Sequence, residues 1–265
     1  MALNIRTKLT LTVSLLIAGM LTFGALFTAE RFRAALEAEI ATSQYTMLVS
    51  VAEELDTRLE SSHSVLIAAA GSFPQALLAD PDQVQAELDR RQDLHSLFDN
   101  HVFLFTPDGR MFTESPFAPN RRGKDFSFRE YIKNTLSTGK PYISNPYIST
   151  QAHRHPVIMM TAPIFDRDGK LLAILAASLD LMRDNFLGKL ATRTLGHSGY
   201  LYLTTGDRIM VMHPDKTRIF KPFPQGGNLA YDAAINGFQG TRETTNTYGR
   251  HMYVSFTRVK QKDWV

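Results

Sequence analysis

Residues 155–181 read HPVIMMTAPIFDRDGKLLAILAASLDL. Two long apolar runs flank the segment from Asp166 to Gly169, whose aspartates and glycine suit a tight turn. Apolar runs of this kind, bounded by turn residues, are typical of buried strands. Because only a few residues separate the runs, they predict an antiparallel hairpin, and this hairpin decides the fold class.

The same strand-and-turn pattern recurs on both sides of this hairpin. A short helix ending at Gly139 is predicted by FREYIKNTLSTG, and GHSGY (196–200) predicts a tight turn before a strand. Strands and helices do not alternate along the sequence in the way that is typical of a parallel sheet. The prediction is an α+β fold with two successive antiparallel sheets and a few helices. Three further hairpins are predicted at HVFLFTPDGRMFTE (101–114), YLYLTTGDRIMVMH (200–213) and TRETTNTYGRHMYVSF (241–256).

The N-terminus carries LTLTVSLLIAGMLTFGALFTA, 21 uncharged residues at positions 9–29. As a helix this run is ~31 Å long, which matches the ~30 Å hydrocarbon core of a bilayer. Arg6 and Lys8 precede it, so residues 1–8 are expected to stay in the cytoplasm. A cleaved signal peptide is the alternative. Phe27 occupies a position where a cleavage site needs a small residue, so an uncleaved transmembrane helix is favoured.

A long helical stalk is predicted to follow the membrane span. Residues 29–70 contain neither proline nor glycine, and a helix of this length would extend ~60 Å. A second helix is expected from Asp80, as N-cap, and Pro81 to about Leu97. The apolar stripe of the stalk consists of Leu36, Ile40, Val51, Leu55 and Leu59.

The predicted organisation beyond the membrane has three parts. Residues 30–98 form the stalk and the second helix, residues 99–185 a membrane-distal module, and residues 186–265 a membrane-proximal module. The sequence ends within a new apolar stretch at Trp264. Because a natural end in mid-strand leaves an unfinished sheet edge, we expect the second module to be incomplete and the chain to be the front part of a longer protein.

Composition and motifs argue against several functional classes. The net charge is +3, and the basic residues are interspersed with acidic ones, unlike a nucleic-acid-binding surface. The absence of cysteine excludes disulfides, thiolate metal sites and cysteine nucleophiles. No catalytic motif is present, and no cofactor is expected. His153 and His155 could face the same way on a strand, but no third metal ligand is evident, so no metal is expected.

Three segments resemble the membrane-distal half of a double Cache (dCache) sensor domain: DFSFREYI (125–132), TGKPYISNPYIS (138–149) and the hairpin that ends in SLDL (178–181). GHSGYLYLTTGDRIMVMHPD (196–215) resembles the start of the proximal half. The resemblance covers about residues 30–265 and implies two PAS-like modules stacked on a long N-terminal helix. Such domains lie outside the membrane in bacterial chemoreceptors, sensor histidine kinases and cyclic-dinucleotide enzymes, and bind small molecules, usually in the distal module.

Relatives that bind amino acids hold the carboxylate with an arginine and aromatic residues, and the ammonium with a tyrosine and acidic residues. Lys124 stands where a tyrosine is usual, Ile132 replaces another tyrosine, and Ser149 replaces an aspartate. The carboxylate end of the motif is therefore kept and the ammonium end is reduced. This favours a carboxylate-bearing ligand, either an amino acid or an organic acid. The ligand-binding residues that the resemblance implies are Arg129, Tyr131, Tyr147, Ser149, Asp180 and Lys124.

Two interpretations of Arg129 remain open. Its guanidinium either meets a ligand carboxylate or pairs permanently with Asp180 or Asp125 of its own protein. If Arg129 meets a ligand carboxylate, the chain is expected to be the sensory part of a protein of the bacterial inner membrane. That protein is expected to form a homodimer through its stalk and membrane helices. A diguanylate cyclase or a histidine kinase is favoured as output domain, and a chemoreceptor is possible. The alternatives are a ligand-free assembly module and an extracytoplasmic enzyme.

Overall fold

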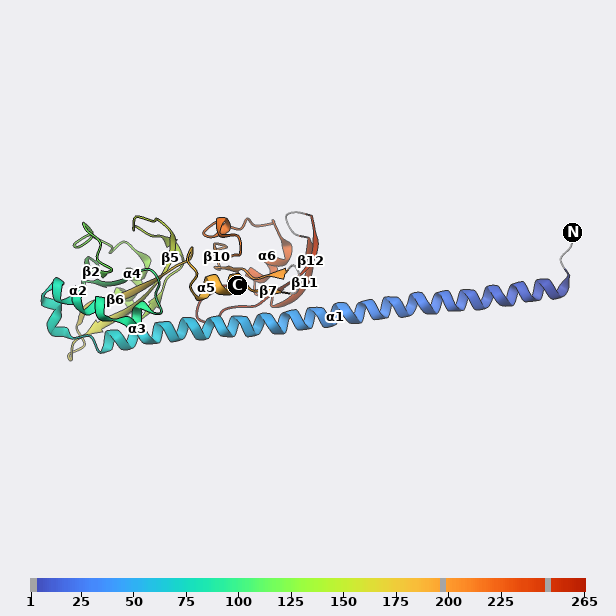
Figure 1. The fold of residues 1–265 in the computed structure, drawn as a ribbon, viewed down its shortest axis with the longest axis horizontal. Coiled ribbons are helices and arrows are strands. Elements are labelled where there is room, and N and C mark those ends of the chain that lie inside the picture. The colour runs from blue at the N-terminus through green and yellow to red at the C-terminus, as the bar shows by residue number, and fades with distance from the viewer. Residues whose placement is uncertain (1–3, 196–198, 246–248) are drawn as a thin grey trace.

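The computed structural model describes residues 4–195, 199–245 and 249–265. Most of the tight turn predicted at 196–200 and the tip of the hairpin predicted at 241–256 lie outside these residues. The N-terminal part of the chain forms one long helix. The globular part packs along the C-terminal half of this helix, and the N-terminal half of the helix extends away from the globular part (Figure 1).

Helix α1 (Ile5–Gly71) is a single helix of 67 residues, so membrane segment and stalk are continuous. Its apolar window has a mean hydropathy of 2.0 and none of it is buried, which makes it a candidate membrane span. Leu36 and Ile40 remain 46% and 47% exposed. The predicted apolar stripe is thus buried only from Val51 onward, where the globular part packs against α1. The buried apolar residues of α1 are Val51, Ala52, Leu55, Leu59, Leu66, Ala69 and Ala70.

After α1 a 3-10 turn (Gln75–Ala79) leads into α2 (Pro81–Arg90). The Asp80 carboxylate accepts a hydrogen bond from the Asp82 backbone N–H at 2.9 Å, so the predicted N-cap is confirmed. The predicted single helix as far as Leu97 is wrong in one respect. Arg91 leaves helical geometry (φ −77°, ψ 70°), and a separate short helix α3 (Gln92–His95) follows.

The large sheet is antiparallel throughout its described pairs, as predicted. Its strands follow the order β2-β1-β6-β5-β3, and β4 pairs with β5 as well. The hairpin of residues 155–181 is confirmed, with Val157 opposite Asp180 and Phe165 opposite Leu171. The strands are β1 (Val102–Phe105), β2 (Met111–Ser115), β3 (Tyr142–Ile143), β4 (Tyr147–Ile148), β5 (Pro156–Phe165) and β6 (Leu171–Asp180).

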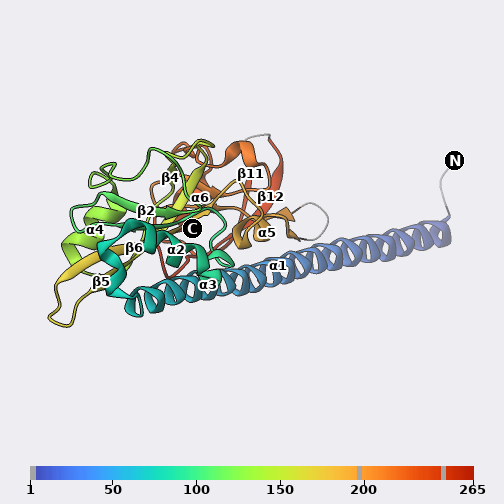
Figure 2. The ribbon, with the colours of Figure 1, turned by 60° about the vertical axis from the view of Figure 1, so that its left-hand side comes forward.

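Alternation along the strands gives this sheet two apolar faces. On β1, Leu104 joins the cluster that packs against α1, whereas Phe103 and Phe105 join a second cluster on the opposite face. Helix α4 (Glu130–Thr138) covers that opposite face and ends, as predicted, at Gly139 in a left-handed conformation (φ 63°). The sheet therefore lies between α1 and α4 (Figure 2).

Within the described residues, the strands of the second part form three antiparallel pairs, β7–β8, β9–β10 and β11–β12, where one sheet was predicted. A few helices were expected beside each sheet, but the positions of the two found here, α5 and α6, were not predicted. Each begins at an asparagine N-cap, Asn185 or Asn228, whose side chain accepts two backbone hydrogen bonds. The elements are α5 (Phe186–Ala191), β7 (Thr194–Leu195), β8 (Gly199–Tyr200), β9 (Leu203–Thr204), β10 (Met210–Met212), a 3-10 turn (Lys216–Arg218), α6 (Leu229–Ile235), β11 (Gly240–Thr245) and β12 (His251–Phe256).

Candidate ligand-binding site

A small cavity lies on the α4 side of the large sheet. The space open to the centre of a water molecule is about 10 Å³, which is roughly room for one water molecule. A ligand larger than water therefore needs the surrounding side chains to move. Besides aromatic and aliphatic side chains, the polar residues that line the cavity include Asn100, Arg121, Arg129, Ser149, Thr150 and Ser178.

Arg129 lines this cavity from the N-cap position of α4, where its backbone is extended (φ −70°, ψ 139°). Its guanidinium lies 4.6 Å from the ring centre of Tyr147 and 5.1 Å from that of Phe128. Nη2 donates a long hydrogen bond of 3.4 Å to the Ile148 carbonyl oxygen. The buried Nε has no hydrogen-bond partner within the described part of the chain.

These contacts leave one edge of the guanidinium available. Nε and Nη2 lie on the same edge, and a carboxylate can accept from both at once. The existing 3.4 Å bond at Nη2 is close to the limit for a hydrogen bond, so little is lost when it is replaced. A buried donor without an acceptor costs free energy, so an incoming carboxylate would satisfy Arg129.

Neither proposed internal partner pairs with Arg129. Asp125 accepts a hydrogen bond from the backbone N–H of Ser127 at 2.8 Å. Asp180 is fully buried, accepts from His155 Nδ1 at 2.7 Å and lies 3.5 Å from Arg183 Nε. Among the ion pairs of residues 4–195, 199–245 and 249–265, none includes Arg129.

Aromatic rings form one wall of the cavity. The ring of Tyr131 lies 5.4 Å from that of Tyr147 and 6.1 Å from that of Phe105, and Phe105 lies 5.6 Å from Phe126. Burial raises the pKa of Tyr131 to about 12, and it raises the pKa of Tyr147 well above its usual value. Both phenols are therefore neutral at physiological pH and can donate hydrogen bonds.

Arg121 is a second guanidinium at the cavity, and the sequence reasoning missed it. Its Nε pairs with the buried carboxylate of Glu114, Nη1 donates to Thr150 Oγ1 at 3.0 Å, and Cζ lies 5.6 Å from the ring centre of Phe126. Burial raises the pKa of Glu114 although Arg121 acts to lower it. The only sequence signal was the basic run 121–124 that precedes the aromatic residues.

Polar side chains close the far end of the cavity. The Asn100 side-chain amide donates to Gln151 Oε1 and to Ser178 Oγ, each at 2.8 Å. Ser149 also donates to Gln151 Oε1, at 3.1 Å. Asn100 and Ser178 were not predicted, because they come from a loop and a strand about 80 residues apart in the sequence.

The structure brings together four of the six predicted ligand-binding residues: Arg129, Tyr131, Tyr147 and Ser149 all line the cavity. Lys124 and Asp180 do not line it. Lys124 is exposed, and its carbonyl oxygen accepts from the Met111 backbone N–H at 2.9 Å. Asp180 lies on the same sheet face as Ser178 but is engaged by His155.

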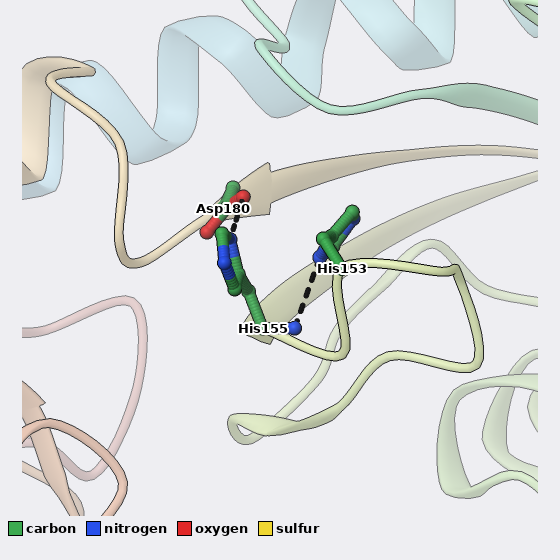
Figure 3. A group of neighbouring side chains, drawn as sticks. All are labelled: His153, His155 and Asp180. Atoms are coloured by element: carbon green, nitrogen blue, oxygen red, sulfur yellow. Dashed lines mark hydrogen bonds and ion pairs between the residues drawn. The ribbon is translucent and has the colours of Figure 1, made fainter.

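His153, His155 and Asp180 form a cluster whose potential ligand atoms all lie within 4.8 Å of one another (Figure 3). Asp180 is thus the third group that sequence spacing did not reveal. His153 Nδ1 accepts from the His155 backbone N–H at 2.9 Å, and Nε2 lies 2.8 Å from Gln151 Oε1. A metal ion would have to replace these hydrogen bonds, so the geometry is that of a hydrogen-bonded junction between β5, β6 and the preceding loop.

Comparison with known proteins matches the chain to one family over nearly its whole length. The dCache family model, described as a Cache domain, matches residues 32–265. The ligand-binding domain of the Pseudomonas fluorescens chemoreceptor CtaA with L-isoleucine superposes with a TM-score of 0.66 and 22% identity, covering 88% of this chain and 92% of that chain.

Two further structures share the fold. The ligand-binding domain of the Pseudomonas aeruginosa PAO1 chemoreceptor PctC with GABA has a TM-score of 0.62 and 19% identity, covering 83% of this chain and 97% of that chain. The extracellular domain of mmHK1S-Z2, a protein described as a histidine kinase, has a TM-score of 0.64 and 16% identity, with 85% and 94% covered. The predicted α+β fold on a long N-terminal helix is thereby confirmed.

Proposed function

The chain belongs to the dCache family of Cache domains, and from that premise we propose that it is a sensory domain for a small carboxylate-bearing molecule outside the cytoplasm. The observation that carries this proposal is the buried Arg129 Nε, a donor at the wall of a cavity for which the described part of the chain supplies no acceptor. A dCache sensor domain is not itself catalytic, so any enzymatic activity belongs to the output part of the protein.

The ligands of the structural neighbours support this class of molecule. CtaA is complexed with L-isoleucine and PctC with GABA, and both ligands carry a carboxylate. At 19–22% identity the likeness is one of fold, so the ligand class rests on Arg129 and its surroundings in this chain. Nε of Arg129, which has no partner within the described residues, and Nη2, whose bond to Ile148 is long, suit a carboxylate from either an amino acid or an organic acid.

Binding requires a local rearrangement, because the cavity holds about one water molecule. The contact that must give way is the 3.4 Å bond from Arg129 to the Ile148 carbonyl oxygen in β4. β4 has only two residues and pairs only with β5, so it is held by few hydrogen bonds. A ligand that takes over Arg129 favours the arrangement with β4 displaced, and it shifts that equilibrium by its difference in affinity.

The N-terminal part of α1 supplies the membrane anchor in this proposal. Its apolar window stands free of the globular part, and Arg6 and Lys8 lie on its N-terminal side. We place the anchor in the bacterial inner membrane, with the sensory domain outside and homodimers formed through α1. The output domain is a diguanylate cyclase or a histidine kinase by preference, and a chemoreceptor as the alternative.

The proposal is tested by ligand binding to the detergent-solubilised chain and to its Arg129→Ala variant. A panel of amino acids and organic acids is first screened by thermal shift, since a ligand of the folded state raises the melting temperature. Titration calorimetry then compares affinities. Loss of a charge-assisted hydrogen bond worth about 1.5–3 kcal/mol should weaken binding roughly 10- to 150-fold.

Arg122→Ala is the matched control. Arg122 is an exposed arginine that pairs with Asp82 and does not line the cavity, so its removal should leave affinity unchanged. Equal affinity of the Arg129→Ala variant and the unaltered protein for every ligand found would reject the role of Arg129.

A further inference from the structure

We propose that the ligand is a short dicarboxylate without an ammonium group, held between Arg129 and Arg121. This inference rests on the proposed function, because it assumes that Arg129 binds a carboxylate. It goes further in assigning a second anchor, Arg121, and in excluding α-amino acids as the preferred class.

The two guanidinium groups stack on rings of one aromatic cluster, in which Phe126 also contacts Phe128 beneath Arg129. Arg121 stacks on Phe126, and Arg129 stacks on Tyr147. Between Phe126 and Tyr147 the ring contacts run through Phe105 and then through Tyr131. Both arginines line the same cavity, and both act electrostatically on the phenols of Tyr131 and Tyr147. A ligand in this cavity therefore meets two positive groups.

Each arginine keeps donors that the described part of the chain does not use fully. Arg129 offers Nε, which is buried without a partner, and Nη2, whose bond is long. Arg121 uses Nε for Glu114 and Nη1 for Thr150, which leaves Nη2 for a second carboxylate. Because Glu114 offsets part of the charge of Arg121, the second carboxylate should be held less tightly than the first.

The cavity lining offers no carboxylate as a counter-charge for an ammonium group. None of its lining residues is an aspartate or a glutamate. Glu114 does not line the cavity and pairs with Arg121 through Oε1, while its buried Oε2 has no partner within the described residues. Asp180 is 0% exposed and engaged by His155 and Arg183. An ammonium group beside two guanidinium groups would lose its hydration without gaining a counter-charge, which is unfavourable.

The size of the cavity favours a short chain. With room for about one water molecule, the rearrangement needed grows with every added carbon. A short diacid therefore reaches both anchors with less expansion than a long one.

The test is titration calorimetry of the detergent-solubilised chain with four matched four-carbon probes. Succinate carries two carboxylates, butyrate only one, GABA replaces one by an ammonium, and L-aspartate adds an ammonium to succinate. Succinate should bind at least about 10-fold more tightly than each of the other three probes, because each of these lacks a charge-assisted contact or adds an unpaired charge. Oxalate, malonate, glutarate and adipate extend the same series by length.

Arg121 is probed together with its partner, because its removal alone would strand the buried Glu114. In the double variant Arg121→Gln, Glu114→Gln both charges are replaced by amides of similar size. The preference for succinate over butyrate should then fall to less than about 3-fold, while the folded state, followed by circular dichroism, stays unchanged.

The outcomes separate the two proposals. If L-aspartate or GABA binds as tightly as succinate, or if an amino acid such as L-isoleucine binds with dependence on Arg129 and no diacid does, the dicarboxylate is wrong and the sensor function stands. If the double variant keeps the full preference for succinate, Arg121 is not the second anchor. If no acid of either kind binds, the proposed function fails as well.

Discussion

The indole Nε1 of Trp264 donates a hydrogen bond to Asn145 Oδ1 at 3.4 Å. Asn145 lies in the loop between β3 and β4 of the large sheet, and Trp264 is buried close to the C-terminal end of the described chain. A second contact supports the first, since Lys262 Nζ lies 4.7 Å from the ring centre of Tyr142 in β3. Tyr147, two residues after Asn145, belongs to the cavity wall. A shift of β4 would therefore alter the contacts that Trp264 and Lys262 make with the large sheet.

Trp264 should therefore report ligand binding. It is the only tryptophan in the sequence, so tryptophan emission, excited selectively, arises from one site. Addition of a ligand that displaces β4 is expected to change the emission of Trp264, and Asn145→Ala should reduce that change without altering affinity. Leu229→Ala, at a residue 78% exposed, serves as the control. Identical spectra with and without saturating ligand would contradict this coupling.

Asp56 should be important for holding the second part of the chain on α1. Its buried carboxylate accepts hydrogen bonds from the backbone N–H groups of Lys260 and Gln261, each at 2.9 Å. Asp56→Ala is expected to reduce the free energy of unfolding by about 2–4 kcal/mol, because two donors lose a charged acceptor. Urea denaturation of residues 30–265 would measure the loss. Glu60→Ala, on the exposed side of the same helix, should change it by less than about 0.5 kcal/mol.

His101 should make the fold sensitive to acid. Burial, with a further effect of Arg121, lowers its pKa to about 4 from 6.5. Below pH 6.5 the unfolded chain binds a proton that the folded chain does not, so stability present above pH 6.5 is lost as pH falls toward 4. The loss is at most about 3 kcal/mol.

Comparison of urea denaturation at pH 7.5 and pH 4.5 between the unaltered protein and His101→Gln isolates this contribution. His63, whose pKa burial also lowers, acts in the same direction, and Glu114, whose pKa burial raises, acts in the opposite one. Both groups remain in the variant, so only the difference between the two proteins belongs to His101. An equal pH dependence in both proteins would show that His101 does not contribute.

Burial along α1 should divide the stalk into two regions of different sensitivity. Leu59 is fully buried and Leu36 is 46% exposed. Leu59→Ala is expected to cost about 2–5 kcal/mol, because it leaves a cavity in the core, whereas Leu36→Ala in the monomer should cost less than about 1 kcal/mol. Thermal unfolding of residues 30–265 at low protein concentration would compare them. A similar loss for both variants would indicate that a partner covers Leu36.

The sequence by itself determined the local elements and the family. The hairpin of residues 155–181, the helix that ends at Gly139 and the N-cap at Asp80 depend on interactions between residues close in the sequence. Turn residues and apolar runs record such interactions directly. The uncharged run at 9–29 is likewise visible directly in the sequence. Arg129 was identified because its aromatic neighbours adjoin it in the sequence.

Only the tertiary structure decided which side chains share the cavity. Arg121, Asn100 and Ser178 come to Arg129 from separate segments, whereas Asp180 is turned to His155. These placements depend on strand register and on how α4 packs against the sheet, and a difference of one residue in register would move a side chain to the opposite face. The kind of ligand group that a side chain suits can therefore be predicted from its neighbours along the chain. Which residues pair with a charged group depends on contacts between segments that are distant in the sequence.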